Sequence, residues 1–193
     1  IPIIASLINS SSSSSTTELS RASLSQASQP MQEFFGNVEM IKKHIHTIAS
    51  AATKINAINQ SFSIATTSDA EQSLTKQSTS TVGDASKKAQ IAKQMLQRLR
   101  EDNERLKTSK DTKQSELRIR ENLTNTLTRK FVDVMKEYQN AQQQFKQDIK
   151  KKVTRQIQIV KPDATTEDVD QIISSGGGSG EVFKKAILQV KYV

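Results

Sequence analysis

The segment ELRIRENLTNTLTRKFVDVMKEYQNAQQQF, residues 116–145, decides the fold class of this chain. Its apolar positions follow one another by alternating steps of four and three residues: Leu127, Phe131, Val134, Tyr138, Ala141 and Phe145. On an α-helix this spacing places the side chains in one stripe, which has to be buried against other helices. The segment therefore predicts a long amphipathic helix, over about 112–153, in an all-α protein.

Two more helices are expected before this one. Apolar residues at heptad spacing predict a helix over about 31–62, and a second one follows over about 68–107. Ser68 with Glu71 three residues later has the pattern of a capping box at the start of the second helix. β-Branched residues and a glycine make its stretch 77–83 weak. Short polar turns between long helices favour an elongated up-down-up antiparallel three-helix bundle.

The bundle is predicted over 30–153, with its core formed by the apolar residues of the three stripes. The residues expected to carry this core are Phe34, Val38, Ile41, Ile45, Leu96, Leu99, Leu127, Phe131, Val134 and Tyr138. The Ser-rich residues 1–29 are expected to be disordered, because such a composition buries too little apolar surface to offset chain entropy. Residues 154–193 are expected to form a linker. It would contain a short helix at about 166–174, a glycine-rich break, and the start of a further helix at about 181–192.

Composition and charge exclude several function classes. The chain has no Cys, so neither disulfides nor thiolate metal sites are possible. His44 and His46 point about 200° apart on a helix, so they cannot chelate one ion, and no metal site is predicted. With no nucleophile motif and with carboxylates dispersed over helix faces, we predict no catalytic residues, no cofactor and no enzyme activity.

The net charge of +8 is concentrated late in the chain, since residues 107–155 hold 13 Lys and Arg against 6 Asp and Glu. A solvated basic helix face is the simpler interpretation. The alternative is a basic helical-bundle adaptor that binds acidic membrane surfaces or a partner helix. The residues that would make this contact are Lys146, Lys150, Lys151, Lys152 and Arg155. Nucleic acid is not an expected partner, because no aromatic platform accompanies the basic residues.

Three stretches, in this order, resemble the syntaxin family. MQEFFGNVEMIKKHI (31–45) is similar to the first helix of the syntaxin N-terminal domain, and residues 116–146 are similar to the third. RQIQIVKPDATTEDVDQIISSG followed by EVFKKAIL, within 155–188, resembles the family's linker. The resemblance covers about 31–188, although the second helix is supported by its apolar pattern alone.

This resemblance implies a regulatory domain of a target-membrane SNARE, acting in vesicle docking and fusion on the cytoplasmic face of a plasma membrane or endomembrane. Its implied partners are SNAP-type and synaptobrevin-type SNAREs, an SM-type regulator, and the membrane through an anchor that is missing here. In the family the SNARE helix folds back onto the bundle, and we expect a dock for it between the second and third helices. The family's linker has a Leu-Glu pair that helps to hold this closed state; Ile157 and Gln158 stand there, so the Glu charge is lost and they are the predicted linker switch.

Overall fold

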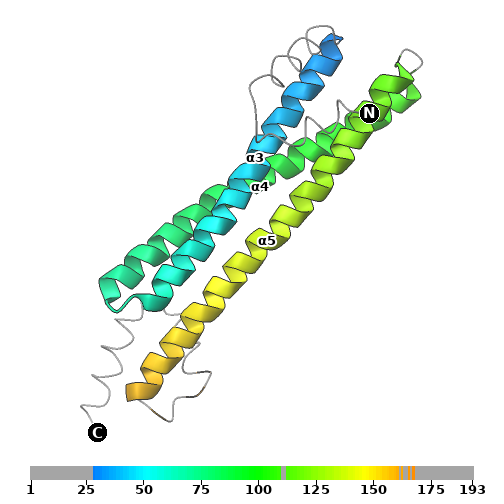
Figure 1. Ribbon diagram of the computed structural model, residues 1–193. Helices are drawn as coiled ribbons and strands as arrows, with labels where there is room; N and C mark the ends of the chain where they lie inside the picture. The colour runs from blue at the N-terminus through cyan, green and yellow to red at the C-terminus, as the bar shows by residue number, and fades with distance from the viewer. Residues whose placement is uncertain (1–27, 110–111, 161, 163–164, 166, 168–193) are drawn as a thin grey trace. The chain divides into compact units, whose positions relative to one another are not determined.

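The computed structural model describes residues 28–109, 112–160, 162, 165 and 167. Within these residues the chain forms three helices and no strand (Figure 1). The helices are α3 (Gln29–Ile64), α4 (Ser68–Thr108) and α5 (Gln114–Val160). The predicted all-α class and three-helix bundle are therefore confirmed for the described part of the chain.

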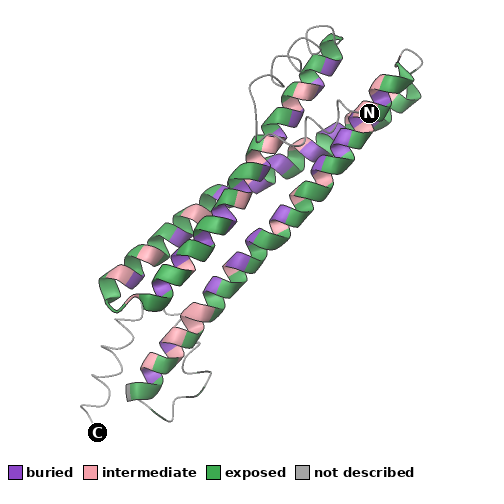
Figure 2. Cartoon of the chain, in the orientation of Figure 1, coloured by how far each residue is buried: buried purple, intermediate pink, exposed green. Residues whose placement is uncertain are grey.

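The three helices build two compact units, and each helix contributes one segment to each unit. Unit 1 combines the described residues up to Ile41 with Met95–Leu127, and unit 2 combines Lys42–Gln94 with the described residues from Thr128 onward. Figure 2 shows the buried residues recurring along each helix, as the heptad spacing requires.

The C-terminal end of α5 differs from the prediction. Residues 154–160 were expected in the linker, but they continue α5 as far as Val160. The apolar spacing explains the extension, because Val153 and Ile157 are both buried and the first helix-breaking residue is Pro162. The Ser-rich tail and the helices expected at about 166–174 and 181–192 lie outside the described residues, apart from Ser28, Gln29 and Glu167.

The start of α4 also differs from the prediction. The backbone N–H of Ala70 donates to the Thr67 hydroxyl oxygen at 3.3 Å, so Thr67 rather than Ser68 caps the helix. The Glu71 side chain does not complete a capping box; it is buried and makes a tertiary contact described below. The predicted cap was therefore wrong by one residue, and Glu71 contributes to tertiary packing instead of capping the helix.

The weak stretch at 77–83 is helical throughout. The hydroxyls of Thr75, Thr79 and Thr81 each donate to the carbonyl oxygen four residues earlier, at 2.8, 3.0 and 2.8 Å. These bonds satisfy the polar side chains without breaking the backbone ladder, which is how the helix accommodates them.

Nine of the ten predicted core residues are buried, and Phe131 is the exception. Phe131 is only half-buried, and the next residue on α5, Val132, is 44% exposed. This flank of α5 is therefore not fully covered by the other helices of unit 2. The spacing places Phe131 in the apolar stripe, but it does not tell how far the neighbouring helices extend over that stripe.

We expect that Gly36→Ala and Gly83→Ala each raise the free energy of unfolding by about 1 kcal/mol. Both glycines are exposed within helices, and a Cβ atom added at either one meets no atom within 4 Å. Because Gly36 lies in unit 1 and Gly83 in unit 2, the two gains should add in the double variant. Urea unfolding of the four proteins measures this, and a lower midpoint for either single variant would contradict it.

Candidate functional site

Lys152 joins all three helices at one end of unit 2. Its Nζ donates to the carbonyl oxygens of Phe62 and Ala65, both at 2.7 Å, and forms an ion pair with Glu71 Oε1 at 2.8 Å. The ammonium also lies 4.7 Å from the centre of the Phe62 ring. All three donors of the ammonium are thereby used. The contact satisfies carbonyls at the C-terminal end of α3, where a cation is also favoured by the helix dipole.

The burial of this pair makes it more than a surface salt bridge. The side chain of Glu71 is 6% exposed and that of Lys152 is 19% exposed. Charges removed from water to this degree depend on each other, because either one alone would be left without a counter-charge. We call Lys152, Glu71 and the carbonyls of Phe62 and Ala65 the Lys152 cluster.

A second polar contact holds α5 to α3 one turn before the Lys152 cluster. Asn59 Nδ2 donates to Asp148 Oδ2 at 2.7 Å, and Gln144 Nε2 donates to the same oxygen at 3.0 Å. These hydrogen bonds lower the pKa of Asp148, the one from Asn59 most strongly. Because the folded pKa lies below the unfolded value, this stabilisation is present above the unfolded pKa. It is lost as the pH falls through the folded one.

The two predicted switch residues lie on the last turns of α5. Ile157 is buried at 2% exposure, whereas Gln158 is exposed. They therefore face in different directions, and only Gln158 is accessible to a binding partner. The neighbouring Gln156 has a buried Oε1 atom without a hydrogen-bond partner.

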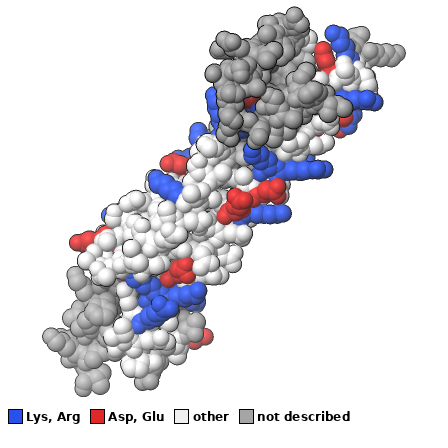
Figure 3. All heavy atoms as spheres, in the orientation of Figure 1, with Lys and Arg blue, Asp and Glu red and all other residues white. Residues whose placement is uncertain are grey.

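The five cations predicted to contact an anionic surface do not act alike. Lys152 is committed to the Lys152 cluster and is not accessible as a surface charge. Lys151 is 63% exposed, with its Nζ 3.6 Å from Asp148 Oδ1, while Lys146 and Arg155 are exposed. Lys150 is half-buried. Figure 3 shows Lys and Arg side chains interspersed with Asp and Glu on the face in view, so the basic charge does not form one uniform field there.

An apolar surface is exposed on α5 within unit 2. The Tyr138 hydroxyl donates to the Val82 carbonyl oxygen at 3.0 Å and lies 3.1 Å from Ser86 Oγ, so it links α5 to α4 at this position. One to two turns before Tyr138 come Phe131, Val132 and Met135, all partly or largely exposed and adjacent on the helix surface. We call these three residues the α5 apolar patch.

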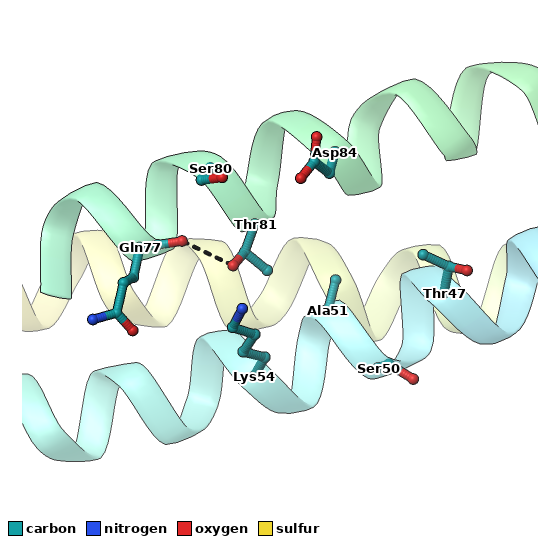
Figure 4. Close-up of a pocket in the computed structure, with 8 residues that line it drawn as sticks. All are labelled: Thr47, Ser50, Ala51, Lys54, Gln77, Ser80, Thr81 and Asp84. Carbon is teal, nitrogen blue, oxygen red and sulfur yellow. Dashed lines mark hydrogen bonds between the residues drawn. The ribbon is translucent and has the colours of Figure 1, made fainter.

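A hollow of about 340 Å³ lies between α3 and α4 in unit 2 (Figure 4). Gln77 and Thr81 extend from α4 toward α3, and the Thr81 hydroxyl donates to the Gln77 carbonyl oxygen at 2.8 Å. Small polar side chains and one residue of each charge line the hollow: Thr47, Ser50, Ala51, Lys54, Gln77, Ser80, Thr81 and Asp84. The lining lacks His and Cys and has a single carboxylate, so it assembles no general acid–base pair.

Unit 1 contains a buried polar cluster that the sequence did not reveal. Arg120 Nε donates to Asn103 Oδ1 at 3.1 Å, and Arg120 Nη1 donates to the Pro30 carbonyl oxygen at 3.3 Å. The guanidinium carbon lies 4.5 Å from the centre of the Phe34 ring, and Asn103 Nδ2 donates to Thr124 Oγ1 at 3.2 Å. Arg120, Asn103 and Thr124 are all buried. Burial lowers the pKa of Arg120, while nearby carboxylates act in the opposite direction.

The histidines and carboxylates build no metal site in the part of the chain that the structure describes. No group of three potential ligands comes together among those residues. Burial, with a smaller contribution from Lys88, lowers the pKa of His44. Among the same residues, no helix is sufficiently long and apolar to span a bilayer.

Two comparisons with known proteins agree with this architecture. A family model described as Syntaxin matches residues 28–187, a range that includes all three helices. The fold is also similar to a chain in the crystal structure of the Unc18–syntaxin 1 complex from Monosiga brevicollis. That match has a TM-score of 0.67 and 24% sequence identity, and it covers 90% of this chain and 83% of the other.

Proposed function

The chain belongs to the syntaxin family of SNARE proteins and forms a syntaxin N-terminal three-helix domain, and we propose that this domain regulates SNARE assembly in vesicle docking and membrane fusion. In this proposal the domain acts on the cytoplasmic face of a target membrane. It limits the access of SNAP-type and synaptobrevin-type partners to the SNARE helix of the same syntaxin. The domain works by binding and release, and no chemical step is required.

The observation that carries the proposal is the α5 apolar patch. Phe131, Val132 and Met135 leave apolar area exposed to solvent, one to two turns before the point where Tyr138 links α5 to α4. An amphipathic helix that packs its apolar face on this patch would bury that area and gain about 25 cal/mol per Å². We infer that the SNARE helix occupies the patch in a closed state and leaves it in an open one.

The switch between these states is assigned to the last turns of α5. Ile157 anchors this part of the helix in the core of unit 2, whereas Gln158 is exposed and available to a regulator. A conformational change in these last turns would also move the residues that follow Val160 in the chain. The Monosiga brevicollis protein was crystallised with Unc18, and this supports an SM-type regulator as the partner that shifts the equilibrium.

The test compares rates of ternary SNARE assembly. In the natural syntaxin that includes its SNARE helix, assembly should be slower than with the isolated SNARE helix. Val132→Asp combined with Met135→Asp should accelerate it about tenfold, because two partly exposed apolar contacts are lost from the closed state alone. Ile91→Asp, at a similarly exposed apolar position on α4, is the matched control and should leave the rate unchanged.

Three results would count against this mechanism. Equal rates for the natural protein and the isolated SNARE helix would exclude a closed state. An effect of Ile91→Asp as large as that of the patch variant would show that the patch is not the dock. Binding of an SM-type regulator that is insensitive to Gln158→Ala would remove Gln158 from the switch.

A further inference from the structure

Two isoleucines at one end of unit 2 are the most exposed large apolar side chains among the described residues. Ile64 is 81% exposed and Ile159 is 77% exposed. Ile64 lies at the end of α3, between Phe62 and Ala65, whose carbonyls bind Lys152. Ile159 lies two turns after Lys152 on α5. Both side chains therefore belong to the end of unit 2 that the Lys152 cluster holds together.

Cations lead up to Ile159 along the surface of α5. Lys151, Arg155 and Ile159 follow one another at intervals of four residues, so they project from one side of the helix. Lys151 is 63% exposed, and its 3.6 Å separation from Asp148 is that of a weak surface pair. Arg155 is exposed. The row thus presents two accessible cations followed by an exposed isoleucine.

The segment of α5 that carries this row is strongly basic. Residues 146–159 contain five Lys and Arg and a single acidic residue, Asp148. Lys152 neutralises Glu71, whereas Lys146, Lys151 and Arg155 are exposed to the solvent. A single exposed isoleucine would need no explanation. Two of them at the same end of unit 2, one of them following two exposed cations on α5, have the composition of a surface that enters the interface of a membrane.

We propose that this end of unit 2 binds the surface of a membrane that contains anionic lipids. The membrane edge, as we name it, consists of Ile64, Lys151, Arg155 and Ile159. The isoleucines enter the boundary between headgroups and acyl chains, and the two cations remain beside the lipid phosphates and carboxylates. Lys152, which the sequence places in the same basic cluster, takes no part because its donors are already used.

The first measurement is co-sedimentation of this chain with vesicles. We expect binding to phosphatidylcholine vesicles that contain phosphatidylserine at low salt, weaker binding at physiological salt, and none to phosphatidylcholine alone. Absence of binding to the acidic vesicles at low salt would overturn the proposal.

Paired variants distinguish binding through the membrane edge from attraction of the vesicle by the net charge of the chain. Lys151→Gln with Arg155→Gln should weaken binding about 25-fold, about fivefold for each cation. Lys130→Gln with Lys136→Gln removes the same charge from exposed positions on the same helix and should weaken it about twofold or less. Equal losses for the two pairs would overturn the proposal, because the attraction would then depend on net charge alone.

The isoleucines distinguish a membrane from a polyanion such as nucleic acid. Ile64→Ser with Ile159→Ser should weaken vesicle binding about tenfold, whereas Ile91→Ser should leave it unchanged. The chain has no Trp, so Ile159→Trp provides a single tryptophan whose emission should shift to the blue on acidic vesicles. Unchanged binding of the double Ser variant, or no shift of the tryptophan emission, would show that the isoleucines do not enter the bilayer and would refute the proposal.

Discussion

Lys152→Met is expected to lower the free energy of unfolding by about 3 kcal/mol. The methionine keeps the aliphatic stem, but the ammonium that binds Glu71 and the carbonyls of Phe62 and Ala65 is lost. Glu71 would remain buried without its partner, at a side-chain exposure of 6%. Urea unfolding followed by circular dichroism measures the loss.

The neighbouring lysine provides the matched control. Lys151→Met removes the same charge one residue away, from a side chain that is 63% exposed, and should change the free energy of unfolding by less than about 0.5 kcal/mol. Adding Glu71→Leu to Lys152→Met should recover much of the loss, because no buried charge then remains unpaired. Equal unfolding midpoints for Lys151→Met and Lys152→Met would contradict a structural role for the Lys152 cluster.

Arg120→Met is expected to lower the free energy of unfolding by about 2–3 kcal/mol. Without the guanidinium, the buried Asn103 Oδ1 loses its donor, the Pro30 carbonyl loses a contact, and the Phe34 ring loses its cation. Arg120→Lys should restore only part of this, because one ammonium cannot reproduce the planar fork. Thermal and urea unfolding of both variants measure the difference.

Arg118 is the control for this second prediction. It is exposed on the same turn of α5, so Arg118→Met should be nearly neutral. Full recovery of stability by Arg120→Lys would show that charge alone, and not the geometry of the guanidinium, matters at this position. An unchanged midpoint for Arg120→Met would contradict the cluster altogether.

The sequence predicted the fold class because heptad spacing depends on one helix at a time. Ile41, Ile45, Leu96 and Leu99 are buried as their spacing requires. The capping-box pattern missed the cap at Thr67 by one residue, since neighbouring Ser and Thr are both good caps. The end of the bundle was predicted too early, because Val153 and Ile157 continue the apolar stripe beyond the point where polar residues accumulate.

The family likewise could be predicted from the chain alone, because the ordered stretches at 31–45, 116–146 and 155–188 resemble syntaxins and a family model matches 28–187. What the domain binds depends on surfaces, and these were predicted less well. Lys152 was expected among the surface cations and is committed to Glu71, whereas Phe131 was expected in the core and is half-exposed. The spacing of residues on one helix does not show which residue of another helix lies opposite.

The sequence by itself therefore determined that the described chain forms three amphipathic helices with one buried stripe each. The tertiary structure alone decided which polar side chains cross between helices: Glu71 with Lys152, Asn59 with Asp148, and Asn103 with Arg120. The physical reason is that each of these contacts depends on the register between helices. That register is set by how the turns and all the buried side chains pack together, and no single helix encodes it.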